Sequence, residues 1–417
     1  MEAGMIIQFY RKKVGMTQEE LGEGICSATH ISKIERGLTE FSGEITDMLA
    51  DRLDIKLERE LYYLSNIKKK LDMWHDAMVN YQMGEAAEIW RKLKKNPLLG
   101  ISDYQIYYQL LEFMYLLKQN LSEYWKIKAQ KIPTDVAHLS AFEQNLSKHV
   151  WGIYYIQTGE QDIAIQHMKA IEFDHYSNGL VYFDFAVAYY YDNSRVLSYY
   201  YAEKALQLFK QKNNFLGIID AENLMIIQIG FDNLRDFKET EEQFNNLLRI
   251  CDAIHSMDNK GKLLHNFAYE NFRRENYLEA AMLYKQSMDL KEKQSENYLL
   301  SLEGYIRSGY HGGFATKEEL LLEIHEGLKI AKTLDLTLYI LILNVHKYAI
   351  LEKQTDYYRY IHEKAVPYFK ENGYFTIAKR YEKELFIHYD QMGEKDVALE
   401  IARGMIQAYT NTEEVIE

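Results

Sequence analysis

Residues 17–37 read TQEELGEGICSATHISKIERG, and the fold of the first part of the chain can be predicted from them. Thr17 and Ser27 are residue types that cap helices, so each is expected to begin a short helix, with a turn of a few residues between them. The apolar side chains that would hold the two helices together are Leu21, Ile25, Ile31 and Ile34. This spacing predicts a helix-turn-helix, whose second helix enters the major groove of double-stranded DNA.

The outer face of the second helix is expected to carry the DNA contacts. Two short capped helices can also occur without a nucleic-acid role, but the turn cysteine and the pattern Ser-x-x-x-Ile-Ser-x-Ile-Glu-x-Gly occur here together. The stretch resembles the Xre-type helix-turn-helix family. Carried over by position, that resemblance implies DNA contacts at Gln18, Ser27, Thr29, His30 and Lys33. It also implies a structural salt bridge between the first and third helices, from Arg11 to Glu35.

The charge of the chain limits how it can bind DNA. The formal net charge is −13, which argues against nucleic acid wrapped over the whole surface, because phosphate affinity comes from Lys and Arg. Residues 1–41 hold five Lys and Arg but six Glu, so even this segment is not basic. We therefore expect two copies to bind a palindromic operator together, as a homodimer or higher oligomer.

Composition favours a helical protein of the cytoplasm. The 417 residues include only three prolines, and hydrophobic residues make up 47%, so we expect helices nearly throughout and almost no sheet. Cys26 and Cys251 are too few for a disulfide framework and suit a reducing compartment. No apolar run approaches the roughly 20 residues that span a bilayer, and no signal segment is recognised at the amino terminus.

The rest of the chain repeats itself. An aromatic-rich helix, a short polar turn such as QMGE or QTGE and a second helix recur at a period near 40 residues. One equivalent position in each second helix is occupied by Ala87, Tyr124, Ala164, Ser198, Thr240, Ala280, Leu320, Tyr358 and Ala398. The pattern predicts an all-α chain: a helix-turn-helix domain (1–55), a connecting helix (56–75) and a domain of about nine tetratricopeptide-like hairpins (76–417) that form a right-handed superhelix.

Together, GICSATHISKIERG and the hairpins resemble the peptide-pheromone receptors of Gram-positive bacteria, the Rap/Rgg/NprR/PlcR/PrgX family, and most of all its NprR-type members. The resemblance implies a transcription regulator whose concave groove binds a short signalling peptide. An alternative is a regulator that sequesters a response-regulator protein through its repeats. A third is a peptide-responsive regulator of a phage or mobile element.

Asparagines are the expected ligands of the peptide. In the family, groove asparagines hydrogen-bond the peptide backbone, and the resemblance points first to Asn266, in LHNFAYEN, and then to Asn223, in AENLMIIQIG. An amide side chain offers both a donor and an acceptor to an extended backbone, which makes this choice physically sensible. Asn271 and Asn344 are weaker candidates.

Signals of enzymatic activity are poor. The chain has no H-E-x-x-H, no phosphate-binding G-x-x-x-x-G-K-[ST] and no Gly-rich dinucleotide loop. His311-Gly312-Gly313 resembles an oxyanion-hole turn, but no G-x-S-x-G nucleophile accompanies it, so a loop between hairpins explains it better. We expect no catalytic residues, no metal site and no cofactor.

Overall fold

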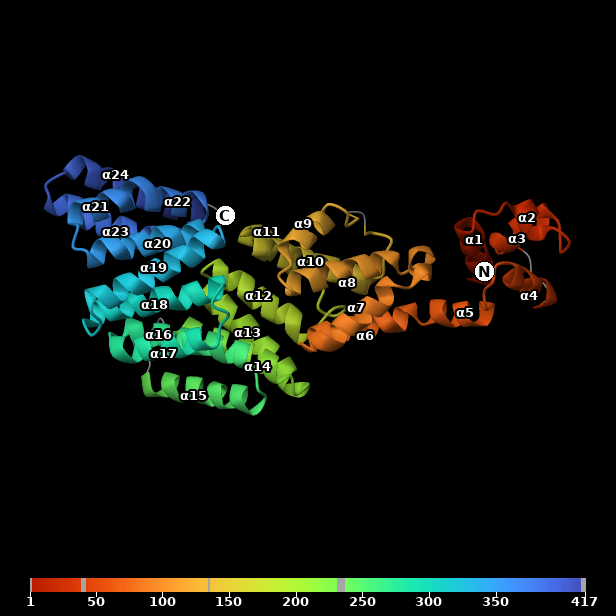
Figure 1. Ribbon diagram of the computed structural model, residues 1–417, viewed down its shortest axis with the longest axis horizontal. Coiled ribbons are helices and arrows are strands. Elements are labelled where there is room, and N and C mark those ends of the chain that lie inside the picture. Colours follow the sequence, from red (N-terminus) through yellow and green to blue (C-terminus); the bar gives the residue numbers. More distant parts are fainter. Residues whose placement is uncertain (1, 39–42, 134–135, 231–236, 414–417) are drawn as a thin grey trace. The chain divides into compact units, whose positions relative to one another are not determined.

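The computed structural model describes residues 2–38, 43–133, 136–230 and 237–413, and within these ranges the chain is helical without a strand (Figure 1). The all-α prediction is confirmed. None of the described helices combines the length and the apolar character that crossing a membrane requires. Internal contacts divide the chain into two units, Met1–Leu224 and Met225–Glu417, and each is described by itself below.

The first unit begins with five helices, of which the second and third form the helix-turn-helix. The five are α1 (Glu2–Lys13), α2 (Gln18–Gly22), α3 (Ala28–Glu35), α4 (Gly43–Arg52) and α5 (Leu57–Ser65). The core of this domain consists of Ile7, Leu21, Ile31, Ile34, Leu49 and Leu53. The predicted contacts of Leu21, Ile31 and Ile34 are therefore confirmed, because the helical spacing places them on the facing sides of α2 and α3.

The segment predicted as one connecting helix is two helices. The helix α5 ends at Ser65, and α6 (Ile67–Val79) follows after Asn66. The Asn66 side chain donates to the carbonyl of Tyr62 at 2.7 Å, and the Ser65 hydroxyl donates to the same carbonyl at 3.1 Å. Such side-chain bonds compete with the helical ladder. The prediction failed because α6 already belongs to the first hairpin, with α7 as its partner.

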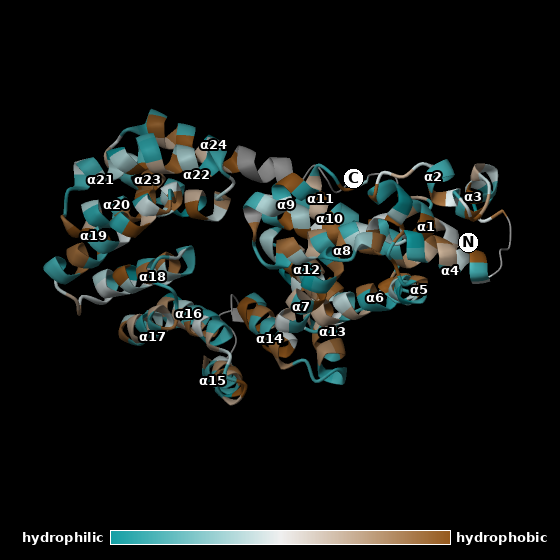
Figure 2. Ribbon diagram, turned by 45° about the vertical axis from the view of Figure 1, so that its right-hand side comes forward, coloured by the Kyte–Doolittle hydropathy of each residue, from teal (hydrophilic) through white to brown (hydrophobic). Residues whose placement is uncertain are grey.

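In sequence order, the described helices from α6 onward form nine successive pairs, which agrees with the predicted number of hairpins. The remaining helices of the first unit are α7 (Met83–Lys94), η1 (Pro97–Ile101), α8 (Gln105–Lys118), α9 (Ser122–Ala129), α10 (Ala141–Thr158), α11 (Gln161–Lys169), α12 (Gly179–Tyr191) and α13 (Arg195–Gln211). The boundary between the units falls inside α14 (Phe215–Gly230). The repeat helices carry both hydrophobic and hydrophilic residues, as packing in hairpins requires (Figure 2).

The second unit continues the same arrangement. Its helices are α15 (Phe237–Ala253), α16 (Met257–Arg273), α17 (Tyr277–Asp289), α18 (Glu296–Gly312), α19 (Lys317–Thr333), α20 (Thr337–Ile350), α21 (Gln354–Tyr360), η2 (Ile361–Ala365), α22 (Val366–Glu371), α23 (Phe375–Gln391) and α24 (Lys395–Glu413). The handedness of the whole stack stays a prediction.

The repeat register is right in most second helices and shifted in three. Six of the nine equivalent positions are buried: Ala164, Ser198, Thr240, Ala280, Leu320 and Ala398. In the first two hairpins the buried residue lies one position earlier or later, at Ala86 and Trp125. In the eighth, Ile361 is fully buried where Tyr358 was expected. There the helix widens to a π turn in η2 just before Pro367, which has no N–H to continue the ladder.

Candidate DNA interface and repeat-domain sites

Both caps of the predicted helix-turn-helix are present. The Thr17 hydroxyl accepts from the Glu20 amide at 3.1 Å, and the Glu20 carboxylate accepts from the Thr17 amide at 2.7 Å, which makes a capping box. The Ser27 hydroxyl accepts from the His30 amide at 3.3 Å and begins α3. The Ser27 cap therefore sets where α3 starts, and this start sets which side chains of α3 point outward.

A buried ion pair joins α3 to α1. Arg11 donates through Nε and Nη2 to the two carboxylate oxygens of Glu35, at 2.5 and 3.0 Å, and through Nη1 to the carbonyl of Met16 at 2.7 Å. Burial alone would raise the pKa of Glu35, but the bonds from Arg11 and Gln18 outweigh it and hold that pKa below its usual value. The salt bridge that the resemblance implied is confirmed.

The structure gives Gln18 a second role beside the expected DNA contact. Its side-chain amide donates to Glu35 at 2.8 Å and so joins the network around the ion pair. Ser27, Thr29 and Lys33 are exposed on the start and outer face of α3. His30 is half-buried, and within the described residues its Nε2 atom has no hydrogen-bond partner. Thr29 and Lys33 are thus the expected contacts whose side chains make no hydrogen bond or ion pair with the described residues.

The four candidate asparagines of the repeat domain lie in different surroundings. Asn223 on α14 and Asn266 on α16 are half-buried. Asn344 on α20 is also half-buried, and its amide donates to the carbonyl of Ile340 at 2.7 Å. Asn271 is only 2% exposed. Its side-chain amide donates to the carbonyl of Phe267 at 3.0 Å, and its side-chain oxygen accepts from Asn276 at 3.4 Å. These bonds stabilise the carboxyl-terminal end of α16. The expectation that Asn271 contacts a ligand is therefore corrected.

The second unit contains a cavity that the sequence analysis missed. It has a volume of about 490 Å³, and its walls come from the first helices of successive hairpins, α16, α18, α20 and α23, and from the start of α21. Its charged side chains include Arg307, Arg380 and Glu384, and its aromatic ones include Tyr310 and Tyr358. An arginine on the apolar side of an amphipathic helix is the signal that could have revealed it.

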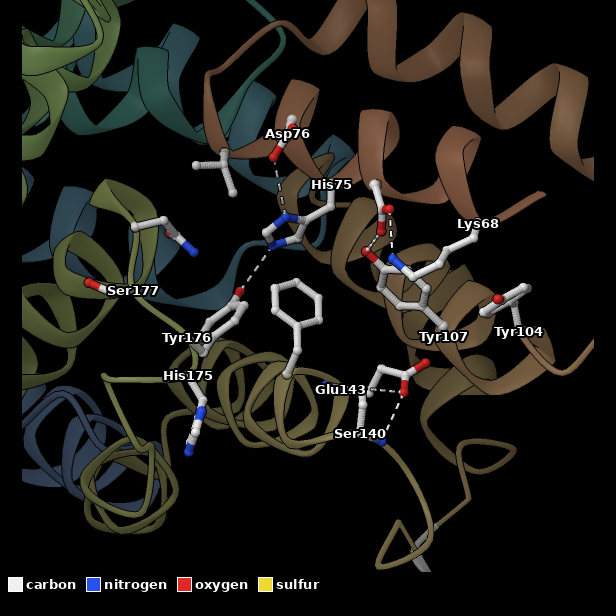
Figure 3. A pocket seen from close by; sticks show the side chains of 14 residues that line it. Lys68, His75, Asp76, Tyr104, Tyr107, Ser140, Glu143, His175, Tyr176 and Ser177 are labelled. Carbon is white, nitrogen blue, oxygen red and sulfur yellow. Dashed lines mark hydrogen bonds and ion pairs between the residues drawn. The ribbon is translucent and has the colours of Figure 1, made fainter. Parts of the chain in front are cut away.

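A second cavity, of about 540 Å³, lies in the first unit (Figure 3). Helices α6, α8 and α10 and the segment before α12 line it. Lys68 donates to Asp72 at 2.8 Å, and the hydroxyl of Tyr107 donates to the same carboxylate at 3.2 Å. The acidic groups at this cavity are thus largely engaged in structural bonds.

One wall of this cavity connects to a buried chain of hydrogen bonds. Nε2 of His75 lies 3.2 Å from the hydroxyl of Tyr176, which lies 2.9 Å from Nδ1 of His149. Nε2 of His149 is 2.9 Å from Asp184, which also pairs with Lys118 at 2.6 Å. Burial lowers the pKa of His149, although the Asp184 carboxylate opposes this. The chain links α6, α8, α10 and α12 through polar contacts.

No grouping of His, Cys, Asp and Glu in the described ranges could hold a metal ion.

The fold and its first helices define a class: a helix-turn-helix protein whose remaining chain is a tetratricopeptide-like repeat domain. Residues 7–59 match the helix-turn-helix family HTH_3.

Over nearly its whole length, the chain is similar to the transcriptional activator NprA of Geobacillus stearothermophilus, with 21% identity over 89% of this chain and 94% of the relative. Solved structures share the fold. The apo form of the quorum sensor NprR from B. thuringiensis superposes with a TM-score of 0.66 at 19% identity, covering 82% of this chain and 98% of NprR. NprR in complex with its cognate peptide NprX gives 0.68 at 19% identity, covering 83% and 99%. A Rap protein with competence and sporulation factor gives 0.72 at 12% identity, covering 84% and 99%. The resemblance to NprR-type proteins that the sequence predicted is confirmed.

Proposed function

We propose that this protein is a cytoplasmic transcription regulator whose DNA binding responds to a short peptide bound by its repeat domain. The observation that carries the proposal is the exposed face of α3, held by the buried pair of Arg11 and Glu35, at the head of a chain of helical hairpins. The relative named as a transcriptional activator and the NprR structure with its cognate peptide support it. No enzymatic activity is part of the proposal.

Two residues of α3 test the DNA-binding half. Thr29→Ala and Lys33→Ala should each weaken binding to duplexes selected from a random library by the full chain, because the exposed side chains would contact bases or phosphates, each contact contributing about 1–3 kcal/mol. Fluorescence anisotropy measures the affinity, and the selected duplexes should be palindromic.

Ser27→Ala is the matched control for stability. It removes the bond from the His30 amide and should cost about 1 kcal/mol of folding free energy, whereas the Thr29 and Lys33 variants should melt like the wild type. Unchanged DNA affinity in both the Thr29 and the Lys33 variant would refute the assignment of α3 as the helix that contacts DNA.

The proposed domains are residues 1–55 for DNA and, for peptide sensing and oligomerisation, the repeats that begin with α6 rather than at the predicted residue 76, so that α5 alone is the connection. Within the repeats, Asn266 is the first candidate for the peptide backbone, followed by Asn223 and Asn344. A peptide shifts the equilibrium between two states of the repeats only by its difference in affinity for them. Asn266→Ala should weaken peptide binding and leave DNA binding without peptide intact; equal peptide affinity in a fluorescent-peptide titration would remove that residue from the site.

The second candidate function, which only the sequence resemblance raises, is sequestration of a response-regulator protein through the repeats. A pull-down with the full chain and with the Thr29 and Lys33 variants separates the two functions. A signalling protein retained equally by all three supports sequestration through the repeats, and the absence of any such partner opposes it.

A further inference from the structure

Arg307 lines the cavity of the second unit, and part of its hydrogen-bonding capacity is unused. Its side chain is 13% exposed, and its guanidinium group lies 4.2 Å from the ring of Phe272. The nearest carboxylate, Glu303, is 3.7 Å from Nε, which is too far for a hydrogen bond. Across the described residues, Nε has no hydrogen-bond partner. A buried donor without an acceptor is costly, so this position suits an incoming acceptor.

Arg380, from α23, lines the same cavity. It donates to the hydroxyl of Tyr381 at 2.8 Å. A guanidinium group has five N–H donors, so the two arginines together offer more donors than these contacts and the bond from Arg307 to the Tyr284 hydroxyl use. Of the acidic neighbours, Glu303 bonds to His346 at 3.0 Å and forms an ion pair with Arg307 at 3.7 Å, and Glu384 accepts from Tyr357 at 2.7 Å. The unmet capacity of the cavity is therefore for an acceptor.

Among the groups of a peptide, a carboxylate fits this capacity best. Two oxygens in a plane match the fork of a guanidinium group and can take two parallel hydrogen bonds. The volume of about 490 Å³ falls within the range of ordinary ligand sites. Tyr310 and Tyr358 supply apolar surface around the arginines.

Tyr269 lies between Arg307 and the proposed backbone site at Asn266. Tyr269 follows Asn266 by three residues on α16, so the two side chains lie on one face of the helix. The Tyr269 ring in turn faces Arg307, at 6.0 Å from the guanidinium carbon. A peptide held at Asn266 can therefore extend along α16 toward Arg307.

We propose that Arg307 and Arg380 bind a carboxylate group of the signalling peptide, either its carboxyl terminus or an Asp or Glu side chain. The inference rests on the proposed function, because it assigns the chemistry of one end of the peptide site. The signalling peptide would thus be anchored by its backbone at Asn266 and by its charge at the two arginines.

Mixed heptapeptide libraries test the inference without knowledge of the peptide. Four libraries combine a free or amidated carboxyl terminus with the presence or absence of Asp and Glu, and mass spectrometry identifies what the immobilised full chain retains. The wild type should retain peptides that carry a carboxylate. Loss of one partner of a buried charged bond should reduce this retention about thirtyfold in Arg307→Gln and Arg380→Gln.

Two further variants control for folding and for charge. Arg359→Gln changes an arginine of the same unit that is 61% exposed and should bind like the wild type. Arg307→Lys keeps the charge but removes the fork, so it should bind more weakly than the wild type. Circular dichroism checks that each variant is folded.

The outcomes are distinguishable. Preference for free termini assigns the terminal carboxylate, and preference for Asp and Glu in amidated libraries assigns a side chain; both support the inference. Equal retention of all four libraries overturns it and leaves the proposed function standing. Retention of no peptide by the wild type overturns both.

Discussion

His149 shows how one residue couples folding to pH. It is fully buried in α10, between Tyr176 and Asp184. Its pKa in the folded chain lies below the ordinary value of 6.5 because burial disfavours the charged ring. As the pH falls through 6.5, the unfolded chain takes up a proton at this residue that the folded chain does not. Folding stability should therefore fall, by up to about 1.4 kcal/mol per pH unit from this residue.

His149→Gln should lower stability at pH 7.5 and weaken its dependence on pH between 6.5 and 5. Urea unfolding at several pH values measures both effects. His175→Gln is the matched control, because His175 lines the neighbouring cavity but its side chain is 56% exposed. A His149 variant with the acid sensitivity of the wild type would contradict this explanation.

Residue-scale prediction from sequence succeeded where the signal is local. Thr17, Ser27 and the pair of Arg11 and Glu35 all stand in the expected roles, because caps depend on neighbours within one turn and the pair follows a family pattern. The prediction failed for Asn271, because the residues around it in the sequence do not reveal that its side-chain amide donates to a carbonyl of its own helix.

At the scale of elements, close packing of helices depends on single glycines. A Cβ atom on Gly304 of α18 would lie 2.3 Å from the ring of Tyr284 on α17. Gly304→Ala should therefore destabilise the second unit by about 1–3 kcal/mol, since the buried ring must move. Thermal unfolding followed by circular dichroism measures the loss.

Gly261→Ala is the control for the same unit. Its Cβ would meet Leu290 and Lys291 at 3.6 Å or more, which is ordinary contact. The gain in helix propensity should make this variant neutral or more stable by up to about 1 kcal/mol. Equal melting temperatures of the Gly304 and Gly261 variants would show that the packing of α17 on α18 is not tight.

At the scale of the whole molecule, charge limits DNA binding. The chain carries a net charge of −13, and Arg11 is engaged with Glu35. Among residues 2–38, the exposed cations of one copy are Lys12, Lys13, Lys33 and Arg36. Two copies that use all of them would give a slope of log affinity against log salt no steeper than about −7.

A salt titration of the selected duplex, followed by anisotropy, tests this limit. Lys33→Ala should make the slope shallower by about two for a dimer. A slope much steeper than the limit would mean that other surfaces of the chain contact DNA, and a slope below half of it would favour binding by one copy.

The helical class, the helix-turn-helix and the repeat period could all be predicted from the order of the residues. Caps, turn residues and apolar spacing act within a few residues, so their effect can be read in order along the chain. Which polar residues meet inside the repeats became visible only once the helices were packed. Arg307 and Arg380 come from α18 and α23, and His149 and Asp184 come from α10 and α12. Their proximity depends on how hairpins stack, and burial then sets how many hydrogen bonds and charges each group can satisfy.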